Sequence, residues 1–160
     1  MSTRSRIGRQ NDNGTVTSIY CHFDGYVDGV GAMLAEHYQD SAKVDALLAL
    51  GNISVLAEEI GEPHDFDWTR EYYALSKDGW AARDADPRAR MCLAYGRDRG
   101  EPQQDARTDP DARTFWARRR DSWAEFQYLF VNGGWVVQRG GSAPVALDIA
   151  MRALKAEPAE

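Results

Sequence analysis

The chain of 160 residues has the length of one domain, and its 43% of hydrophobic residues argues against a disordered protein. The net charge is −6, and residues 10–82 carry 13 acidic and three basic side chains, so we expect no direct nucleic-acid binding. No apolar run reaches the roughly 18 residues that a membrane span needs. The N-terminus lacks the apolar core of a signal peptide, and we therefore expect a cytoplasmic protein with no membrane partner.

Cysteine usage excludes two kinds of stabilisation. Cys21 and Cys92 are the only cysteines, too few for a disulfide framework or a four-cysteine zinc site. Each stands in an apolar, strand-like run, where a free cysteine behaves as a small hydrophobic residue. We predict no cofactor and no metal.

The first predicted element is a β-hairpin. Residues Arg4–Arg9 and Thr15–Phe23 read as strands, and Asp12-Asn13-Gly14 between them favours a tight turn because Asn and Gly accept positive φ. Alternation gives the second strand two faces. The face expected to meet the core holds Ile19, Cys21 and Phe23. The opposite face, toward solvent or a shallow groove, holds Tyr20 and His22.

A polar loop and three helices are predicted next. Residues 24–31 hold three Gly and two Asp and should form the loop. Apolar spacing and capping residues predict a helix over Val30–Tyr38, a second from Asp40 or Ser41 to Gly51, and a third, capped by Asn52 or Ser54, ending at Gly61. Residues 62–82 fit a helix or a strand, with a turn signal at Lys77-Asp78-Gly79.

The second half of the chain predicts a strand, a loop and a second hairpin. Residues Arg90–Tyr95 read as a short buried strand, and 96–111 as an exposed, mobile loop. The remaining predicted elements are a helix over Ala112–Ala124, a hairpin of Glu125–Val131 with Trp135–Arg139, and a helix over Pro144–Lys155 with Val145, Ile149 and Leu154 inward. A short flexible C-terminus follows.

These elements together predict an α+β fold. Two β-hairpins, at about 4–23 and 125–139, and a central strand near 90–95 would build a mainly antiparallel sheet packed with three or more helices. We expect one globular domain over residues 1–160.

Three segments carry a resemblance to a known family. They are SRIG-x-x-N-x-x-GTVTSIYCHFDGY-x-x-GVG from Ser5, YGRDRGE at 95–101, and YLF-x-x-GGW-x-V at 128–137. Together they resemble a family of small bacteriophage and prophage proteins to which we attach no activity. The resemblance implies expression in the cytoplasm of an infected bacterium, beside short genes that antagonise host defences or redirect host machinery. It implies no catalytic residue.

One candidate site is an arginine-bearing loop. Tyr95, Arg97 and Arg99 follow the predicted central strand, and Arg119 belongs to a second basic cluster. Arginine binds phosphates and carboxylates in bidentate geometry, so these residues are candidates for binding an anionic, nucleotide-like ligand. The alternative is a solvated loop whose Arg and Asp side chains pair locally.

The other candidate site is the end of the second strand. Tyr20, His22, Asp24, Tyr26 and Asp28 gather there and could form part of a partner surface. A metal or acid–base cluster around His22 and Asp24 is an alternative, and a loop that only caps the following helix is another. We assign no catalytic residue, because no nucleophile motif is present.

The expected function is binding rather than catalysis. We expect a phage-type accessory protein that binds a host protein, in counter-defence or host takeover, with its acidic 24–78 region against a basic partner surface. The alternatives are a nucleotide-sequestering protein that uses Arg97 and Arg99, with a homo-oligomer as one assembly, and a small hydrolase or metal-dependent enzyme centred on His22 and Asp24.

Overall fold

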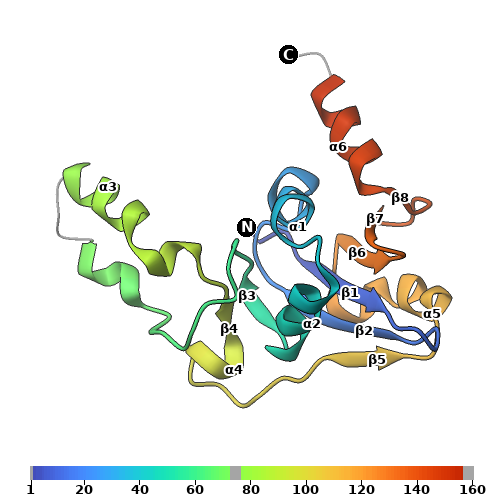
Figure 1. Cartoon of the computed structure of the whole chain (residues 1–160), viewed down its shortest axis with the longest axis horizontal. Helices are drawn as coiled ribbons and strands as arrows, with labels where there is room; N and C mark the ends of the chain where they lie inside the picture. The colour runs from blue at the N-terminus through green and yellow to red at the C-terminus, as the bar shows by residue number, and fades with distance from the viewer. Residues whose placement is uncertain (1, 73–76, 157–160) are drawn as a thin grey trace.

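The computed structural model describes residues 2–72 and 77–156 and contains one mixed sheet (Figure 1). The strand order among the described residues is β4-β3-β2-β1-β6-β7-β8, and β5 pairs with β2 beside β3. The strands are β1 (Ser5–Gln10), β2 (Val16–Cys21), β3 (Ile53–Val55), β4 (Leu93–Ala94), β5 (Arg107–Asp109), β6 (Phe126–Val131), β7 (Gly134–Arg139) and β8 (Val145–Ala146). The α-helices are α1 (Ala32–His37), α2 (Ser41–Ala49), α3 (Lys77–Ala85), α4 (Tyr95–Asp98), α5 (Ala112–Ala117) and α6 (Leu147–Ala156).

Shorter helical turns complete the described chain. A π-helical turn, η1 (Val27–Gly31), leads directly into α1. Three 3-10 turns are η2 (Trp68–Tyr72), η3 (Pro87–Arg90) and η4 (Arg119–Ser122).

The α+β class and both predicted hairpins are confirmed. β1 pairs with β2, and β6 with β7, in antiparallel register. The two hairpins are joined by parallel pairing of β1 with β6, in which Ile7 lies opposite Tyr128. Among the described residues five strand pairings are antiparallel and two are parallel.

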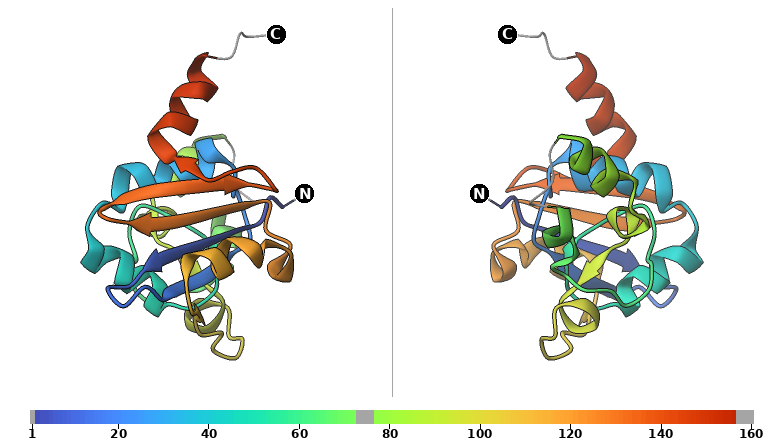
Figure 2. Two further views of the ribbon diagram at one scale, coloured as in Figure 1. Left: turned by 90° about the vertical axis from the view of Figure 1, so that its right-hand side faces the viewer. Right: turned by 90° about the vertical axis from the view of Figure 1, so that its left-hand side faces the viewer.

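The main core lies between the sheet and the helices α1, α2 and α6. Its fully buried members include Ile7, Ile19, Leu34, Leu47 and Tyr128. A smaller core of Val16, Phe115 and Leu129 lies under α5 on the opposite face. In the left view of Figure 2, α5 lies in front of the strands of the two hairpins. Beside α5 on this face, η4 packs against β1, and the side chains of Arg6, Ser18 and Gln127 are also buried.

Two predictions about strands are corrected. The helix predicted to end at Gly61 is wrong, because Ile53–Val55 form β3, where Ile53 pairs with Cys21 of β2. β-branched side chains suit this position beside a buried strand. The strand near 90–95 is confirmed only over Leu93–Ala94, and β4 lies at the edge of the sheet rather than in its centre.

The predicted loops are also more structured than expected. The exposed loop over 96–111 is wrong in part, because it contains α4 and β5, and Asp98 and Asp109 are buried there. The turn predicted at Lys77-Asp78-Gly79 is wrong, since α3 begins at Lys77. Of the segment 62–82, which fitted a helix or a strand, the parts within η2 and α3 are helical, and 73–76 lie outside the described residues.

Toward both ends of the chain, apolar side chains that were predicted to face the core are exposed. Phe23 is 42% exposed because β2 ends at Cys21. Val145, Ile149 and Leu154 are 43%, 53% and 40% exposed. The reason is that α6 projects from the body of the molecule (Figure 1), and only Leu147 at its base is fully enclosed. The flexible end predicted after Lys155 lies, over 157–160, outside the described residues.

The capping predictions for the second helix are confirmed. The Asp40 carboxylate accepts a hydrogen bond from the Ala42 backbone N–H at 3.2 Å, and Val44, Leu47 and Leu48 are buried. The helix predicted over 112–124 is present as α5 and the turn η4. None of the helices in the described ranges has the length and apolar character needed to cross a bilayer.

Candidate functional site

The face of the sheet that α5 partly covers carries a group of cationic and aromatic side chains at the end of β2. Tyr20 and His22 lie two residues apart on one face of the chain, and the Tyr20 Oη is 2.7 Å from the His22 Nδ1. β1 runs antiparallel beside them with Arg6 opposite Tyr20, so Arg4 comes next to His22. We call Arg4, Tyr20, His22, Tyr95 and Arg99 the cationic–aromatic face.

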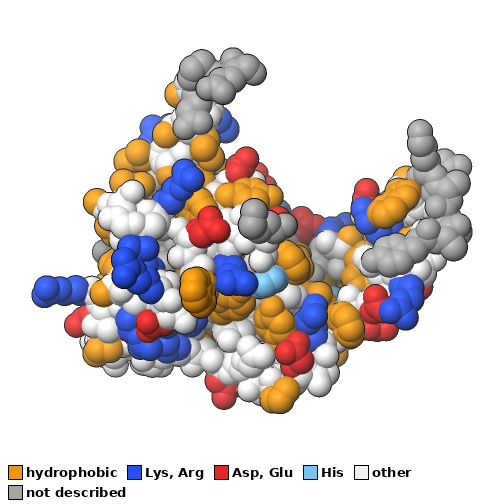
Figure 3. All heavy atoms as spheres, turned by 180° about the vertical axis from the view of Figure 1, so that it is seen from behind, with side chains coloured by type: hydrophobic (Ala, Val, Ile, Leu, Met, Phe, Trp, Pro, Cys, Tyr) orange, Lys and Arg blue, Asp and Glu red, His pale blue; other side chains and the backbone are white. Residues whose placement is uncertain are grey.

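Tyr95 and Arg99 reach this face from a distant part of the chain. Asn52 connects the two parts, since its side-chain oxygen accepts from the Tyr20 N–H at 2.9 Å and its carbonyl accepts from the Tyr95 N–H at 3.2 Å. The Arg99 guanidinium lies 5.4 Å from the centre of the Tyr95 ring and 4.9 Å from that of Phe66. Both distances fall in the range of cation–π contacts. Figure 3 shows basic, hydrophobic and histidine side chains side by side over the middle of the rear surface.

The charges on this face act on His22. Partial burial and the nearby positive charges of Arg4 and Arg99 lower the pKa of the His22 imidazole below its ordinary value of 6.5. Burial raises the pKa of the Tyr20 hydroxyl, which therefore stays protonated at neutral pH. A protonated Tyr20 hydroxyl can donate to Nδ1 of the neutral imidazole. That arrangement leaves the Nε2 hydrogen of His22 available to a ligand.

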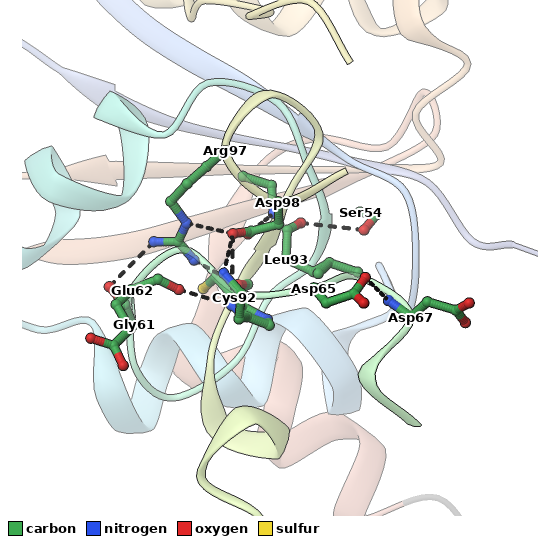
Figure 4. A network of polar contacts seen from close by, with 11 residues as sticks. Ser54, Gly61, Glu62, Asp65, Asp67, Cys92, Leu93, Arg97 and Asp98 are labelled. Carbon is green, nitrogen blue, oxygen red and sulfur yellow. Dashed lines mark hydrogen bonds and ion pairs between the residues drawn. The ribbon is translucent and has the colours of Figure 1, made fainter. Parts of the chain in front are cut away.

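Arg97 forms its hydrogen bonds inside the fold and does not reach this face. Its Nε donates to Asp98 at 2.9 Å, one terminal nitrogen donates to the Gly61 carbonyl at 3.2 Å, and the other to the Cys92 carbonyl at 2.9 Å. The buried Asp98 carboxylate also accepts the backbone N–H groups of Ala94 and His64. In Figure 4 the Arg97 and Asp98 side chains point toward each other at the centre of this network.

Arg119 is not brought to the face either. It opens η4, where its carbonyl accepts from the Ala124 N–H, and η4 packs against β1. Figure 1 shows α5, after which η4 follows, and α4 at different ends of the sheet. Of the four residues predicted to bind an anion, the structure therefore places only Tyr95 and Arg99 together.

Asp24, Tyr26 and Asp28 lie in the loop that leads from β2 to η1. The Tyr26 hydroxyl donates to Asp24 at 3.1 Å, and the Gly25 carbonyl accepts from the buried Tyr128 hydroxyl at 2.7 Å. No side-chain capping bond is formed at the start of η1. The loop is therefore held in part by the Tyr26 and Tyr128 hydroxyls, and the side chains of Asp24 and Asp28 remain at the surface.

Two hollows meet at this loop. A groove of about 450 Å³ between the loop and α6 is lined mainly by apolar side chains, which include Tyr26, Phe126, Val137, Val145 and Leu154. We call it the α6 groove; Asp28 and Glu125 also line it. A smaller hollow of about 240 Å³ has three carboxylates, those of Asp24, Asp28 and Glu36, beside Met33 and Leu56. Tyr26 and Asp28 belong to both.

The metal-ligating side-chain types and the two cysteines bear on the alternatives predicted for His22 and Asp24. Across the ranges 2–72 and 77–156, no group of three His, Cys, Asp or Glu side chains is placed to hold a metal ion. Cys21 and Cys92 are buried, and burial raises the pKa of the Cys21 thiol to about 12, far from a reactive thiolate at neutral pH.

Sequence reasoning missed several members of these surfaces. Arg4 could have been found from the hairpin itself, because antiparallel register places it beside His22. Glu125 and Leu154 of the α6 groove lie 99 and 128 residues after Tyr26 in the chain, and no local signal indicates that they meet.

Comparisons with known proteins add no assignment. No family model matches the chain, and no curated protein or solved structure matches it significantly.

Proposed function

We propose that this chain is a phage-type accessory protein that acts by binding a bacterial host protein, with the α6 groove as its docking surface. The observation that carries the proposal is the exposed apolar surface around α6. Val145 and Leu154 are 43% and 40% exposed, and Tyr26 on the opposite wall is 40% exposed. Contiguous exposed apolar surface of this kind is typical of protein-binding sites.

Charge around the groove indicates the chemistry of the partner. Asp28 and Glu125 line the groove, and Asp24 and Glu36 belong to the adjoining hollow. Arg139 is the basic residue among the lining side chains, and its guanidinium lies over the Phe126 ring at 5.5 Å. An amphipathic segment with apolar anchors and flanking Lys or Arg side chains would satisfy both the groove and its acidic border.

The test compares two substitutions on the same helix. Leu154 lines the groove, whereas Ile149 is exposed and does not line it. Five residues on a helix correspond to a rotation of roughly 140°, so the two side chains point to different sides. Leu154→Asp places a charge in the groove, and Ile149→Asp places the same charge outside it.

Immobilised wild-type and variant proteins are incubated with host lysate, and retained proteins are quantified by mass spectrometry. The dissociation constant of the retained partner is then measured by calorimetry. We expect Leu154→Asp to weaken binding tenfold or more and Ile149→Asp to change it less than twofold. Equal binding by both variants would show that the α6 groove is not the docking surface. The absence of any specifically retained host protein would refute the function itself.

A further inference from the structure

We propose that the cationic–aromatic face is a second binding site, for a nucleotide, with the phosphate between Arg4 and Arg99 and the base against the neighbouring aromatic rings. This site lies on the same face of the sheet as α5, and none of its five residues lines the α6 groove. Its residues differ from those predicted from the sequence for an anionic ligand: Arg4 and His22 belong to the site, and Arg97 does not.

Arg4 is the first observation. In the parts of the chain that the structure describes, its guanidinium forms no ion pair and no hydrogen bond, and its Nε is buried without a partner. By contrast, the neighbouring Arg6 donates three hydrogen bonds to Ser18. A buried donor without a partner costs free energy unless something outside the chain satisfies it. Arg4 thus offers an uncompensated cation on a chain of net charge −6.

Arg99 supplies the second cation in a prepared orientation. Its contacts with the Tyr95 and Phe66 rings restrict the guanidinium before any ligand arrives. Within the described residues its one ion pair is with Glu101, at 3.3 Å from Nε, which leaves the two terminal nitrogens for a phosphate. A stacked arginine retains its planar edge for such bidentate contacts.

The rings around these cations suit a flat heterocycle. Phe66 is 44% exposed and Phe23 is 42% exposed, and Phe23 packs edge-on against His22 with ring centres 4.5 Å apart. Aromatic side chains beside arginines are the usual platform for a base and its phosphate. The neutral His22, which is close to both arginines, adds an N–H donor at Nε2.

A free nucleotide and a nucleotide unit of a single strand share this chemistry. The experiment therefore compares AMP, GMP, CMP and UMP with inorganic phosphate and with a ten-nucleotide single strand. Thermal unfolding of the full chain is followed with each ligand. At ten times the dissociation constant, we expect at least one mononucleotide to raise the melting temperature by roughly 3–5 °C.

Three charge-removing variants locate the effect. Arg4→Gln and Arg99→Gln should abolish the shift, and Arg120→Gln, at an exposed position in η4, should keep it. If a variant is unfolded, the His22 ring resonances of the wild-type protein give a second readout. A bound phosphate offsets the two guanidinium charges, so nucleotide should raise the pKa of His22 measured by NMR.

Each outcome decides the proposal. A rise in melting temperature with a mononucleotide that depends on Arg4 or Arg99 supports it. A larger rise with the ten-nucleotide single strand would show that the site binds a nucleotide unit within a strand. An equal shift with inorganic phosphate overturns base recognition. No shift with any ligand and an unchanged His22 titration, or equal loss in Arg120→Gln, overturns the site.

Discussion

The buried carboxylate of Asp98 should be a principal source of stability in the region around α4. Its side chain is fully buried and accepts hydrogen bonds from Arg97 Nε at 2.9 Å, the Ala94 N–H at 2.7 Å and the His64 N–H at 3.2 Å. Asp98→Ala leaves two backbone donors without partners, at about 1–3 kcal/mol each. Loss of one partner of a buried ion pair costs about 3–5 kcal/mol when the remaining charge is isolated.

These contributions overlap, and Arg97 keeps two carbonyl acceptors, so we expect the lower part of the range. Asp98→Ala should reduce the free energy of unfolding by about 4 kcal/mol. Asp98→Asn, which retains one acceptor oxygen, should reduce it by about 2 kcal/mol. Such losses are large fractions of the roughly 5–15 kcal/mol that stabilises a domain.

Urea denaturation followed by tryptophan fluorescence measures these changes. Asp148→Ala is the control, because Asp148 also forms an ion pair with an arginine but its side chain is 75% exposed. The control should lose less than about 0.5 kcal/mol. If Asp98→Ala lost no more than the control, the reasoning from buried hydrogen bonds would be refuted. Arg97→Gln should destabilise the protein without affecting nucleotide binding by the folded fraction.

Three further predictions concern other parts of the chain. Gly51→Ala should reduce the free energy of unfolding, measured by urea denaturation, by about 3 kcal/mol, and Gly133→Ala should reduce it by about 1 kcal/mol. Both glycines have a positive φ, but only at Gly51 would a Cβ collide with a backbone carbonyl, so equal losses would contradict this prediction. Cys21 and Cys92 should react with a thiol reagent at pH 8 only after denaturation, because burial raises the pKa of both thiols; rapid reaction of the native protein would argue against their burial. The pKa of His22 measured by NMR should lie below 6.5, and a value above 6.5 would contradict the proximity of two arginines. Because folding lowers this pKa, the contribution of His22 to stability is complete above pH 6.5 and is lost as the pH falls through the folded-state pKa.

The hairpins were predictable because their signals are local. Alternating side chains and the Asp12-Asn13-Gly14 turn lie within about 20 residues, and the Asn11 N–H indeed donates to the Thr15 carbonyl across that turn. β3 was missed for the opposite reason. Asn52 and Ser54 suit a helix cap as well as a loop, and Ile53–Val55 become a strand only because β2 lies beside them.

The candidate site shows the same division within one short segment. Arg97 and Arg99 are two residues apart in an apparently uniform polar loop, yet one is held by carbonyls of Gly61 and Cys92 and the other packs on Phe66 at the surface. Local sequence cannot separate them, because their partners come from distant segments.

The sequence by itself determined the α+β class, the two hairpins, the first two helices and the position of Tyr20 and His22 on one side of the chain at the end of β2. Each follows from turn chemistry, side-chain periodicity or capping over a few residues. Only the tertiary structure decided which arginines remain available, which loops become buried and that the apolar residues of α6 stay uncovered. These properties depend on long-range packing, since a side chain's exposure and partners are set by whichever distant segments come to lie against it.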